Sequence, residues 1–594
     1  MNPIIDPRGG DAEDDACSSK KRSLFAIAGS LLGEINLPKL ALAWVILALI
    51  PGVLLGLVPL IATAWFSSVS DRVHAIAGIG SLMLLALVAA IGWYAFRPLF
   101  RVAERNFWSL NSLVVQPGYA LCREGLRHLA ERFLSHDANE ACRAYLRAAT
   151  AIGAGVLACG VASAIALTAW PHTRWSGGMA DLADPLRLVV PALANTVSVM
   201  AAYLAAASLA WGIADGSMDQ PRDLANFDKV PANVRRWRVA HLSDIHVVGE
   251  RYGFRIESGR AGPRGNERLH EVLARLDAIH ARDPLDLLLI TGDMTDAGRS
   301  AEWAEFLDAM ARHPALAARS FILPGNHDVN IVDRANPARL ELPGSAGKTL
   351  RQMRALSAMD TVQGSRVHVV DPAESGLGAG SGLGVSLAEA LEPHRIRIAA
   401  FADTGGFRLS MGLGDVWARA FPMVLPPAEA DGLGVVLLNS NAETHFSFTN
   451  ALGMVGEEDM RAMLSVLAQF PKARWIIALH HHPVEYPMPA KAFSERVGTA
   501  LINGSFFVRQ LKPHGHRIVA MHGHRHVDWV GRCGPLKIIS APSPVMEATD
   551  SEPTHFYIHT LAAAPDGGLA LLEPERIDMT SGPVSALSPE LAVS

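Results

Sequence analysis

The chain has 594 residues, of which half are hydrophobic and only 19% are charged. This length predicts at least two folded units, and the composition is apolar for a soluble protein. The formal net charge of −5 lacks the basic excess of a nucleic-acid-binding protein, so we expect no nucleic-acid partner. The five cysteines are odd in number and form no C-x-x-C pair, which argues against a disulfide framework or a thiolate zinc site.

The apolar excess lies in the first third of the chain. Four stretches there are long and apolar enough to cross a bilayer, which takes about 20 helical residues. Tryptophans such as Trp65 and Trp170 lie near their ends, where the water–lipid interface favours indole rings. We therefore predict four transmembrane helices rather than buried helices of a soluble core. The predicted spans are Leu40–Trp65, Ile76–Phe96, Ala149–Trp170 and Leu186–Ile213.

Positive charge predicts the orientation of these spans. Lysines and arginines gather before the first span, in the loop 97–148 and after the fourth span, whereas the other two loops carry few. Because positive loops stay in the cytoplasm, we predict a multi-pass protein of the cytoplasmic (inner) membrane with both termini and the following domain in the cytoplasm. A cleaved signal peptide is not expected, because the first apolar run begins late and is too long. The basic segment Gly125–Phe133 is either a helix on anionic lipid or a solvated connector.

From about residue 232 the sequence changes to short apolar runs that end in polar residues. Such runs are typical of buried strands in a layered α/β domain. Between them, apolar stripes at helical spacing predict helices around Leu269–Ile279 and Trp303–Met310. Functional groups in open α/β sheets gather at the carboxyl ends of strands, where the polar clusters of this region lie. The predicted strands are contained in WRVAHLSD, DLLLITGD, RSFILPGNHD, GVVLLNSN, RWIIALHHH, RIVAMHGH and LKIIS.

Five polar clusters at these run ends offer carboxylate, imidazole and amide groups, and none offers sulfur. Such ligands suit manganese, iron, zinc or nickel. In Asp244/His246 and in His524/His526 the two residues are two positions apart in the sequence. On extended backbone both side chains would therefore point to one side. The clusters are Asp244-Ile-His246, Gly292-Asp293-Met-Thr-Asp296, Gly325-Asn326-His327-Asp328, His481-His482-Pro483 and Gly523-His524-Arg525-His526.

The motifs D-x-H, G-D-x-x-D, G-N-H-D, H-x-P and G-H-x-H, in this order, resemble those of the calcineurin-like metallophosphoesterase superfamily. LSDIH, LLLITGDMTD and GVVLLNSN are most similar to the class III cyclic-nucleotide phosphodiesterases. The resemblance covers about residues 237–545 and implies a layered α/β domain built as a two-sheet sandwich. We therefore expect a multi-domain protein, with an all-α transmembrane four-helix region followed by a metallophosphoesterase domain.

The resemblance also implies a pair of divalent metal ions (Mn, Fe or Zn), with Asp293 bridging them. His327 would donate a proton to the leaving group, and Asp328 would orient it. Among the three consecutive histidines, the family's ligand stands two residues before the proline, so His481 would coordinate and His480 would end the strand. The first metal would be held by Asp244, His246, Asp293 and His526, and the second by Asp293, Asn326, His481 and His524.

Two cations about 3.5–4 Å apart can share a hydroxide and neutralise the charge that builds on an attacked phosphodiester. We therefore predict hydrolysis of a phosphodiester by metal-bridged hydroxide, with a cyclic nucleotide or a lipid-linked molecule as the substrate class. The histidine of G-N-H-D argues against lipid-A-precursor pyrophosphatase activity, since those relatives carry arginine there. The alternative is a membrane sensor or scaffold whose head binds a nucleotide or phosphate ligand without turnover.

Three residues are candidates for supporting roles around the site. His482 and His522 are expected to approach the metal ligands or the substrate. Asp296 could do the same, but stabilising the N-terminus of the helix that follows from Ala301 is the favoured interpretation. A long insertion, about 329–432, contains the strand-like RIRIAAFAD and is interpreted as a lid or cap over the strand ends, where inserted loops commonly set substrate choice.

The predicted division of the chain follows from these features. Residues 1–39 form a cytoplasmic N-terminal segment, disordered at its start, and residues 40–213 form the four spans. Residues 214–236 are a linker, residues 237–575 form the metallophosphoesterase domain with its insertion, and residues 576–594 are a C-terminal tail.

Overall fold

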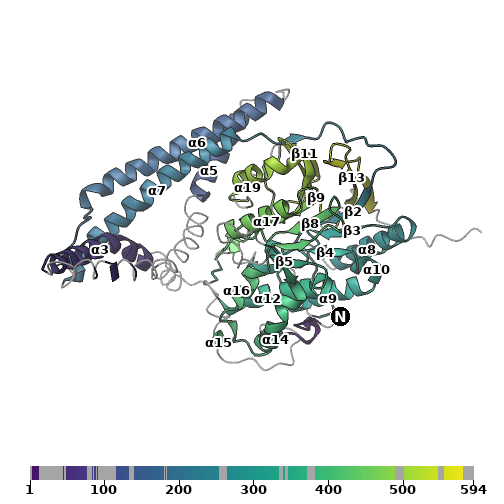
Figure 1. Cartoon of the computed structure of the whole chain (residues 1–594), viewed down its shortest axis with the longest axis horizontal. Coiled ribbons are helices and arrows are strands. Elements are labelled where there is room, and N and C mark those ends of the chain that lie inside the picture. The colour runs from purple at the N-terminus through teal and green to yellow at the C-terminus, as the bar shows by residue number, and fades with distance from the viewer. Residues whose placement is uncertain are drawn as a thin grey trace, which may run out of the picture. The chain divides into compact units, whose positions relative to one another are not determined.

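The computed structural model describes the chain as two compact units. We call the first the head; it comprises residues 1–33, 221–487 and 499–594, and the second, the helical unit, comprises residues 34–220 and 488–498. Figure 1 labels their helices and strands. Apart from a few isolated positions, the described residues are 3–12, 49–75, 116–132, 140–178, 184–252, 264–333, 339–341, 345–370, 382–445, 447–488, 501–545 and 554–579.

Two sheets form the frame of the head. One has nine strands in the order β1-β11-β12-β10-β9-β8-β7-β5-β6, and the other has the order β14-β13-β2-β3-β4, with β15 paired to β13. The larger sheet contains β1 (Arg222–Asp223), β5 (His368–Val370), β6 (Leu383–Ser386), β7 (Met423–Leu425), β8 (Leu433–Leu437), β9 (Arg474–Ala478), β10 (Ile518–His522), β11 (Trp529–Cys533) and β12 (Leu536–Ser540). The smaller contains β2 (Arg236–Leu242), β3 (Leu287–Ile290), β4 (Ser320–Ile322), β13 (Thr554–Ala563), β14 (Leu569–Leu571) and β15 (Glu575–Met579).

The centre of each sheet is parallel, and this arrangement positions the site. Strands β2, β3 and β4 pair in parallel in one sheet, and β8, β9, β10 and β12 do so in the other. The carboxyl ends of the parallel strands of a sheet meet at one edge, so the loops that follow them lie near one another. All seven predicted strand segments are strands here, which confirms the two-sheet α/β prediction for the head.

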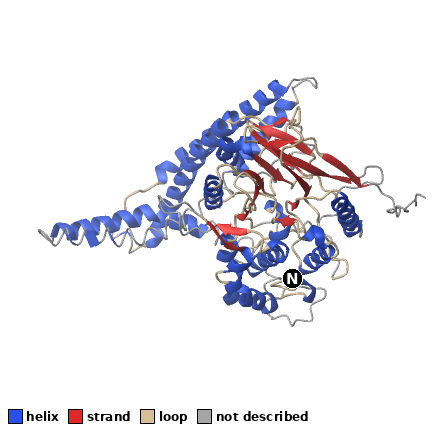
Figure 2. Cartoon of the chain, turned by 45° about the vertical axis from the view of Figure 1, so that its right-hand side comes forward, coloured by secondary structure: helices blue, strands red, loops and turns tan. Residues whose placement is uncertain are grey.

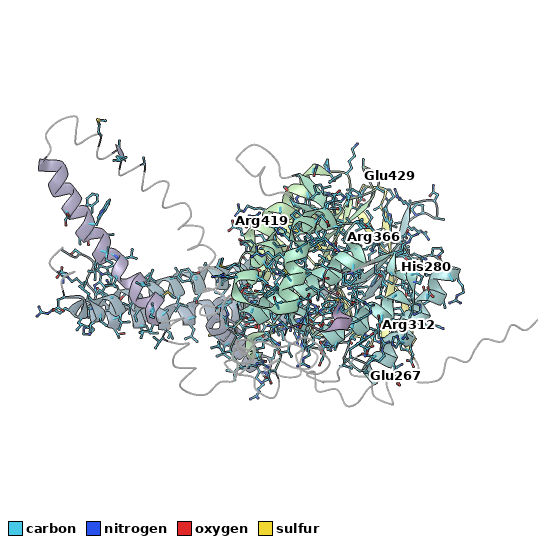
Figure 3. The ribbon with its side chains drawn as sticks, turned by 90° about the horizontal axis from the view of Figure 1, so that it is seen from below. Glu267, His280, Arg312, Arg366, Arg419 and Glu429 are labelled. Carbon is cyan, nitrogen blue, oxygen red and sulfur yellow. The ribbon has the colours of Figure 1, made fainter. Side chains whose placement is uncertain are left out.

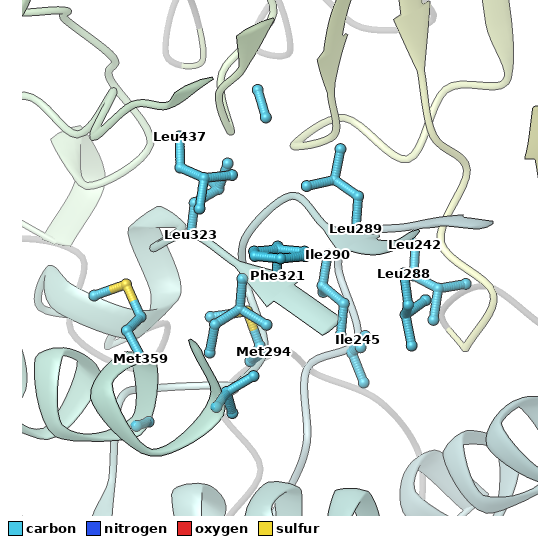
Figure 4. Close-up of a cluster of buried hydrophobic side chains, with 14 of the residues drawn as sticks. Leu242, Ile245, Leu288, Leu289, Ile290, Met294, Phe321, Leu323, Met359 and Leu437 are labelled. Carbon is cyan, nitrogen blue, oxygen red and sulfur yellow. The ribbon is translucent and has the colours of Figure 1, made fainter. Parts of the chain in front are cut away.

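The parallel strands are buried because their sequences are nearly continuous runs of Val, Ile, Leu and Ala. Leu242, Ile290 and Phe321 belong to the hydrophobic core, which Figure 4 shows together with Met359 from the inserted region. Charged side chains such as Glu267 and Arg312 are exposed (Figure 3). The core therefore joins the smaller sheet to helices on its flank.

Both predicted helices of the head are present, and further helices surround the sheets. The apolar stripes at Leu269–Ile279 and Trp303–Met310 lie on α8 and α9. The α-helices of the head are α8 (Arg264–Arg282), α9 (Ser300–Ala311), α10 (Pro314–Ala317), α11 (Asn326–Val329), α12 (Ala346–Gln363), α13 (Leu387–Leu391), α14 (Arg395–Thr404), α15 (Phe407–Ser410), α16 (Leu413–Arg419), α17 (Glu457–Gln469) and α19 (Gly504–Leu511).

The described part of the insertion is not a lid. Helix α12 is buried along most of its length and packs into the core, and β5, β6 and β7 extend the larger sheet. RIRIAAFAD forms helix α14 rather than the expected strand, because Ile398, Phe401 and Ala402 are buried at the spacing of one helical face. The two-residue alternation of its first four residues is too short to set the structure.

Three predicted boundaries are also corrected. Residues 3–12 are ordered and pack into the head, so the expectation of a disordered start is wrong for them. The predicted linker 214–236 contains some secondary structure: α7 continues to Ser217, and β1 pairs with β11. At the other end, β15 continues the domain to Met579, beyond the predicted boundary at residue 575.

The helical unit contains α3 (Ile50–Ala75), α5 (Gln116–Glu131), α6 (Glu140–Ala169) and α7 (Val189–Ser217). Figure 2 shows these helices in blue, and no strand is assigned to the described residues of this unit. Two helices, Ala141–His172 and Leu186–Ser217, are long and apolar enough to cross a membrane. The most apolar windows of these helices are only 28% and 33% buried, whereas a core helix of a soluble protein is mostly buried.

The other two predicted spans lack this support. The described part of the first span lies mostly within α3, whose apolar portion Gly52–Ser68 is shorter than the two helices above and is not counted among the candidate spans. The second span, Ile76–Phe96, lies almost entirely outside the described residues. Two of the four predicted spans therefore correspond to helices of suitable length, and a four-helix membrane region is not confirmed.

Close helix contacts hold the helical unit together. A Cβ added to Gly155 of α6 would lie 2.9 Å from the Cα of Gly212 on α7, so only small residues fit at this crossing. The basic segment from Gly125 is helical as predicted, within α5. Arg123 of this helix pairs with Asp215 of α7 at 2.7 Å, so α5 is packed on the other helices and is not a free connector.

Candidate metal centre

The polar clusters lie in loops at the ends of five parallel strands. Asp244 follows β2, Asp293 follows β3, Asn326 follows β4, His480 follows β9 and His524 follows β10. The loops also contact one another directly: the backbone N–H of His246 donates to the carbonyl of Asp293 at 2.9 Å, and that of His524 donates to Asp244 Oδ2 at 2.9 Å. Ligand candidates that are far apart in sequence are thus brought together.

One group of candidate ligands consists of Asp244, His246 and His526. One ligand atom from each lies within 4.8 Å of the others, and His526 Nε2 is 3.4 Å from Asp244 Oδ1. His246 Nε2 is also 3.7 Å from Asp293 Oδ2, which connects this group to the next one. These are the four residues expected around the first metal.

The second group consists of Asp293, His480 and His524. His480 Nε2 lies 3.3 Å from Asp293 Oδ2, 3.1 Å from His524 Nδ1 and 3.1 Å from Asn326 Oδ1. Two ligand atoms about 2.1 Å from one cation, at angles near 90–110°, are separated by about 3.0–3.4 Å. The spacing therefore suits a shared cation. Asp293 also forms a group with His246 and His327, so it connects the two ends of the cluster, as expected for a bridging carboxylate.

The structure places His480 among these candidate ligands, and the coordination expected of His481 stays a prediction. The Nδ1–H of His480 donates to the carbonyl of Thr291 at 2.7 Å, which leaves Nε2 to face Asp293. Metal-binding histidines typically use their second nitrogen in this way. His481 likewise turns Nδ1 toward the Ser440 hydroxyl at 2.9 Å, and its buried Nε2 makes no hydrogen bond to the described residues. Ser440 Oγ also accepts the backbone N–H groups of both histidines, which fixes the turn that separates their rings.

The backbone of the candidate ligands is unusual. Among the described residues, non-glycine residues with positive φ occur at five positions, and all five are predicted ligands: Asp244 (55°), His246 (47°), Asp293 (51°), His524 (79°) and His526 (52°). The left-handed conformation is uncommon for residues other than glycine. The paired ligands therefore do not share one side of an extended strand, as expected from their spacing; each is directed to the site by a left-handed turn.

Glycines of the motifs permit the close approach of these loops. A Cβ on Gly325 would lie 2.2 Å from the backbone nitrogen of Asp293, and one on Gly523 would lie 1.7 Å from Ser243 Oγ. Contacts of this length are not tolerated, so the glycine of G-N-H-D and that of G-H-x-H each serve loop packing.

His327 lies beside the metal ligands, but Asp328 does not orient its ring. The Nδ1–H of His327 donates to the carbonyl of Asp296 at 2.7 Å, and its ring meets that of His246 edge-on at 4.5 Å. The Asp328 carboxylate accepts hydrogen bonds from the backbone N–H of Gly325 and from Thr295, at 2.9 and 2.6 Å. Asp328 therefore connects two ligand loops. The ring of His327 is oriented by the backbone carbonyl of Asp296, a role that was expected of the Asp328 carboxylate.

Asp296 is buried and lies 3.5 Å from His246 Nδ1 through its carboxylate. Glu302 accepts the backbone N–H groups of Ala297 and Arg299 just before α9, and the favoured interpretation of Asp296 as a helix cap stays a prediction. The contact of Asp296 with the candidate ligand His246 agrees with its alternative interpretation.

The two other supporting histidines are both buried beside the site. The ring of His482 stacks on that of the ligand His524 at 6.0 Å and on Tyr486 at 5.7 Å. His522 directs Nδ1 toward the carbonyl of Gly523 and belongs to none of the candidate metal-binding groups among the described residues. His482 thus contacts a candidate ligand, whereas His522 contacts the loop that carries it.

The charges of Asp293 and His480 stabilise each other within the buried cluster. Burial alone would raise the pKa of Asp293, but the imidazoles of His480 and His327 outweigh it and hold that pKa below its ordinary value. Burial alone would lower the pKa of His480, but Asp293 raises it to about 9. The carboxylate is therefore stabilised by positive charge on its neighbour, which a divalent cation would also provide.

The donor set fits a metal pair. The Nε2 atoms of His246, His481 and His524 are buried and make no hydrogen bond to the described residues. Such atoms are costly to bury unless they gain a partner, and a coordinated cation is one. Carboxylate, imidazole and amide ligands without sulfur suit the borderline divalent metals named above.

Several supporting residues were not predicted from the sequence. Thr291, Thr295 and Ser440 each bond to a ligand loop, yet a lone hydroxyl residue after a strand has no distinctive spacing. The one available signal was their position, since each lies within the polar segment that ends a predicted strand.

Comparison with known proteins identifies part of the head. Residues 238–369 match the sequence profile of the family described as calcineurin-like phosphoesterase. The chain therefore contains a calcineurin-like metallophosphoesterase domain, and its carboxylate and histidine groups form candidate binding sites for the dinuclear metal centre of that family. No protein with a curated description matches the sequence.

Three solved structures illustrate the similarity in fold. A dimetal phosphatase from Danio rerio is 14% identical, with a TM-score of 0.31, over 58% of this chain and 99% of that one. A purple acid phosphatase from yellow lupin is 11% identical, with a TM-score of 0.26, over 59% and 55%. A sulfate thiohydrolase from Thermus thermophilus is 10% identical, with a TM-score of 0.26, over 60% and 58%. Resemblances at this distance carry no argument about the reaction.

Proposed function

We propose that this protein is a membrane-anchored phosphoesterase that uses two divalent metal ions to hydrolyse phosphodiesters. The observation that carries the proposal is the left-handed backbone of Asp244, His246, Asp293, His524 and His526. Each such conformation costs on the order of 1–3 kcal/mol and persists only where the surrounding structure enforces it. Concentration of the strain on carboxylate and imidazole residues in one buried cluster is what a metal-dependent active site requires.

Asp244, His246, Asp293 and His526 would hold one metal, and Asp293, Asn326, His480, His481 and His524 the other. When bound, such a metal pair neutralises phosphate charge and promotes deprotonation of water near neutral pH. The first residue set keeps its expected members, and in the second we propose His480 beside the expected His481, whose Nε2 is buried without a hydrogen bond to the described residues. The chain's own contribution is to hold these side chains before the substrate arrives.

His327 is placed to supply the proton that a departing alkoxide needs. Its Nδ1–H is held by the Asp296 carbonyl, so Nε2 is the nitrogen that can exchange a proton with substrate. The ring is partly exposed, and the backbone N–H of His327 donates to Asp293 Oδ1 at 2.8 Å. His327 is therefore fixed to the bridging carboxylate while one ring edge remains accessible.

Two separate observations favour two different classes of substrate. The sequence resemblance to class III phosphodiesterases favours cyclic nucleotides. The apolar helices α6 and α7 favour a lipid-linked diester presented at the bilayer surface. A screen of the detergent-solubilised full chain against cyclic nucleotides, nucleotide diphosphate conjugates and glycerophospholipid diesters would separate these classes.

The packing of the N-terminal residues limits the topology of the proposed membrane anchor. Residues 3–12 belong to the head, as does the chain from Pro221 onward. Both ends of the intervening region must then lie on one side of any membrane that it crosses. The number of crossings is therefore even, which agrees with two spans, α6 and α7, and with the four predicted from the sequence.

The test of the proposed reaction is hydrolysis of bis(p-nitrophenyl) phosphate by the purified full chain with added Mn²⁺. We expect turnover that disappears in Asp293→Ala and on chelation of the metal, and that persists in Arg419→Ala, an exposed control position (Figure 3). Tight binding of nucleotide or phosphate without turnover of any diester would instead favour the sensor or scaffold alternative.

A further inference from the structure

The N-terminal segment 3–12 is built into the head close to the ligand loop that follows β3. The backbone N–H of Ile5 donates to Ser357 Oγ of α12 at 2.9 Å, and Ser300 Oγ of α9 donates to the carbonyl of Pro7 at 3.0 Å. Ile5 also belongs to the hydrophobic core. The segment thus contacts α12 and the first residue of α9, two residues after the loop ends at Gly298.

A buried ion pair connects this segment to the loop itself. The guanidinium of Arg354 on α12 pairs with both carboxylate oxygens of Asp11, and neither side chain is more than 5% exposed. Arg354 Nη1 also donates to the carbonyl of Gly298 at 2.9 Å. One guanidinium therefore joins Asp11, near the start of the chain, to the end of the loop that begins at Asp293.

Gly298 is held by contacts with Thr295 and Asp328 as well as with Arg354. Its N–H donates to Thr295 Oγ1 at 3.1 Å, and Thr295 in turn bonds to Asp328. Gly298 has a φ of +66°, and a Cβ there would lie 2.4 Å from the Asp328 carbonyl. A displacement of Gly298 would therefore be felt at Thr295 and Asp328, and through them at the ligands Asp293 and Asn326.

We propose that residues 3–12 are a brace for the metal centre, in which Asp11 and Arg354 are positioning residues for the loop 293–298. The brace holds Gly298, and with it the left-handed turn at Asp293, in the geometry that binds metal. This inference rests on the proposed function for its effect on activity. The head would then require a segment that precedes the predicted membrane spans in sequence.

Asp11 and Arg354 are expected to affect metal binding indirectly, because they are not metal ligands themselves. Residues that orient ligands without touching the metal typically change metal affinity by about 10–100-fold when altered. Loss of the Asp11 charge also leaves Arg354 buried without its partner, which disturbs the contact to Gly298. Arg8 of the same segment is different, because it pairs with Asp308 at the surface, where ion pairs contribute little.

The experiment compares Asp11→Asn, Arg354→Lys and the matched control Arg8→Ala in the full chain in detergent. Mn²⁺ binding is titrated by the electron paramagnetic resonance of the free ion, and amide hydrogen exchange is measured on the metal-free protein. We expect Asp11→Asn and Arg354→Lys to weaken Mn²⁺ binding at least about tenfold and to speed exchange in residues 293–299, with strands β9 and β10 unchanged. Arg8→Ala should match the unaltered protein.

A deletion of residues 1–12 supplies the second test, since a synthetic peptide of residues 3–12 should restore Mn²⁺ affinity and slow exchange of the loop. The proposal is overturned if Asp11→Asn binds Mn²⁺ like the unaltered protein, or if exchange rises evenly through the head. If the unaltered protein binds no Mn²⁺, the proposed function fails instead, and the exchange of residues 293–299 still decides whether the brace exists.

Discussion

The ring nitrogens of His480 and His481 have different partners, and these partners separate their roles. His480 directs Nε2 at Asp293, Asn326 and His524, whereas His481 bonds to Ser440. We expect His480→Ala to remove a metal ligand and to abolish diesterase activity at ordinary Mn²⁺ concentrations. His481→Asn should keep activity at saturating Mn²⁺, because an amide can still face the Ser440 hydroxyl.

The measurement is activity as a function of Mn²⁺ concentration for both variants, with thermal unfolding as the control for folding. Both histidines are fully buried, so each substitution will lower stability to some extent. The assignment fails if His481→Asn loses activity at every Mn²⁺ concentration while His480→Ala retains it. That result would leave His481, expected from the spacing to Pro483, as the ligand in place of His480.

His327 provides a second test at the scale of one side chain. A general acid matters most when the leaving group is a poor one, and its removal typically costs about 10²–10⁴-fold. We expect His327→Ala to show such a loss with an alkyl phosphodiester and a much smaller loss with a p-nitrophenyl ester, whose leaving group needs no proton. Equal losses with both substrates would assign His327 to the metal cluster, where it lies with His246 and Asp293.

Among the secondary-structure elements, the start of α9 carries a carboxyl group that the fold holds in an unusual state. Burial raises the pKa of Glu302 to about 8, against the opposing effect of Arg299. Between the ordinary pKa near 4.5 and this value, the folded protein keeps a proton that the unfolded chain releases. Stability due to Glu302 is therefore full below about pH 4.5 and declines as the pH rises toward 8.

Glu302→Gln should remove this dependence, because the amide oxygen can still accept the N–H groups of Ala297 and Arg299. We expect the variant to unfold at a higher temperature than the unaltered protein at pH 8.5 and at a similar temperature at pH 5. Thermal unfolding at both pH values measures the difference. A variant that is destabilised more at pH 8.5 than at pH 5 would contradict the raised pKa of Glu302.

The elements also show what a sequence can and cannot predict. Strands such as β3 and β9 were evident because a run of buried apolar residues has few alternative structures. The turns at Asp244 and His246 were not, since the left-handed conformation leaves no mark in the residue types. Helix α14 was mistaken for a strand because burial of Ile398, Phe401 and Ala402 depends on tertiary packing, which overrides a short local alternation.

At the scale of the whole molecule, the head is built from segments that precede and follow the helical unit in sequence. Residues 3–12 and the strands from Pro221 onward fold together, although 187 residues of the helical unit, 34–220, lie between them. Their position could not be predicted, because Ile5, Arg8 and Asp11 form no periodic pattern and their partners are about 300 residues away. Such long-range contacts are visible only in the folded molecule.

This arrangement leads to a test of membrane topology. If α6 and α7 cross a membrane, the connection between them lies on the side opposite the head, and Ser176 is an exposed position within it. In a background in which the five native cysteines are replaced by serine, we expect Ser176→Cys to react with a membrane-impermeant maleimide in intact cells. Arg312→Cys, on the surface of the head, should react only after lysis. Labelling of both positions in intact cells, or of neither, would contradict an even number of crossings with α6 and α7 as a hairpin, because the hairpin requires the two cysteines to face opposite compartments.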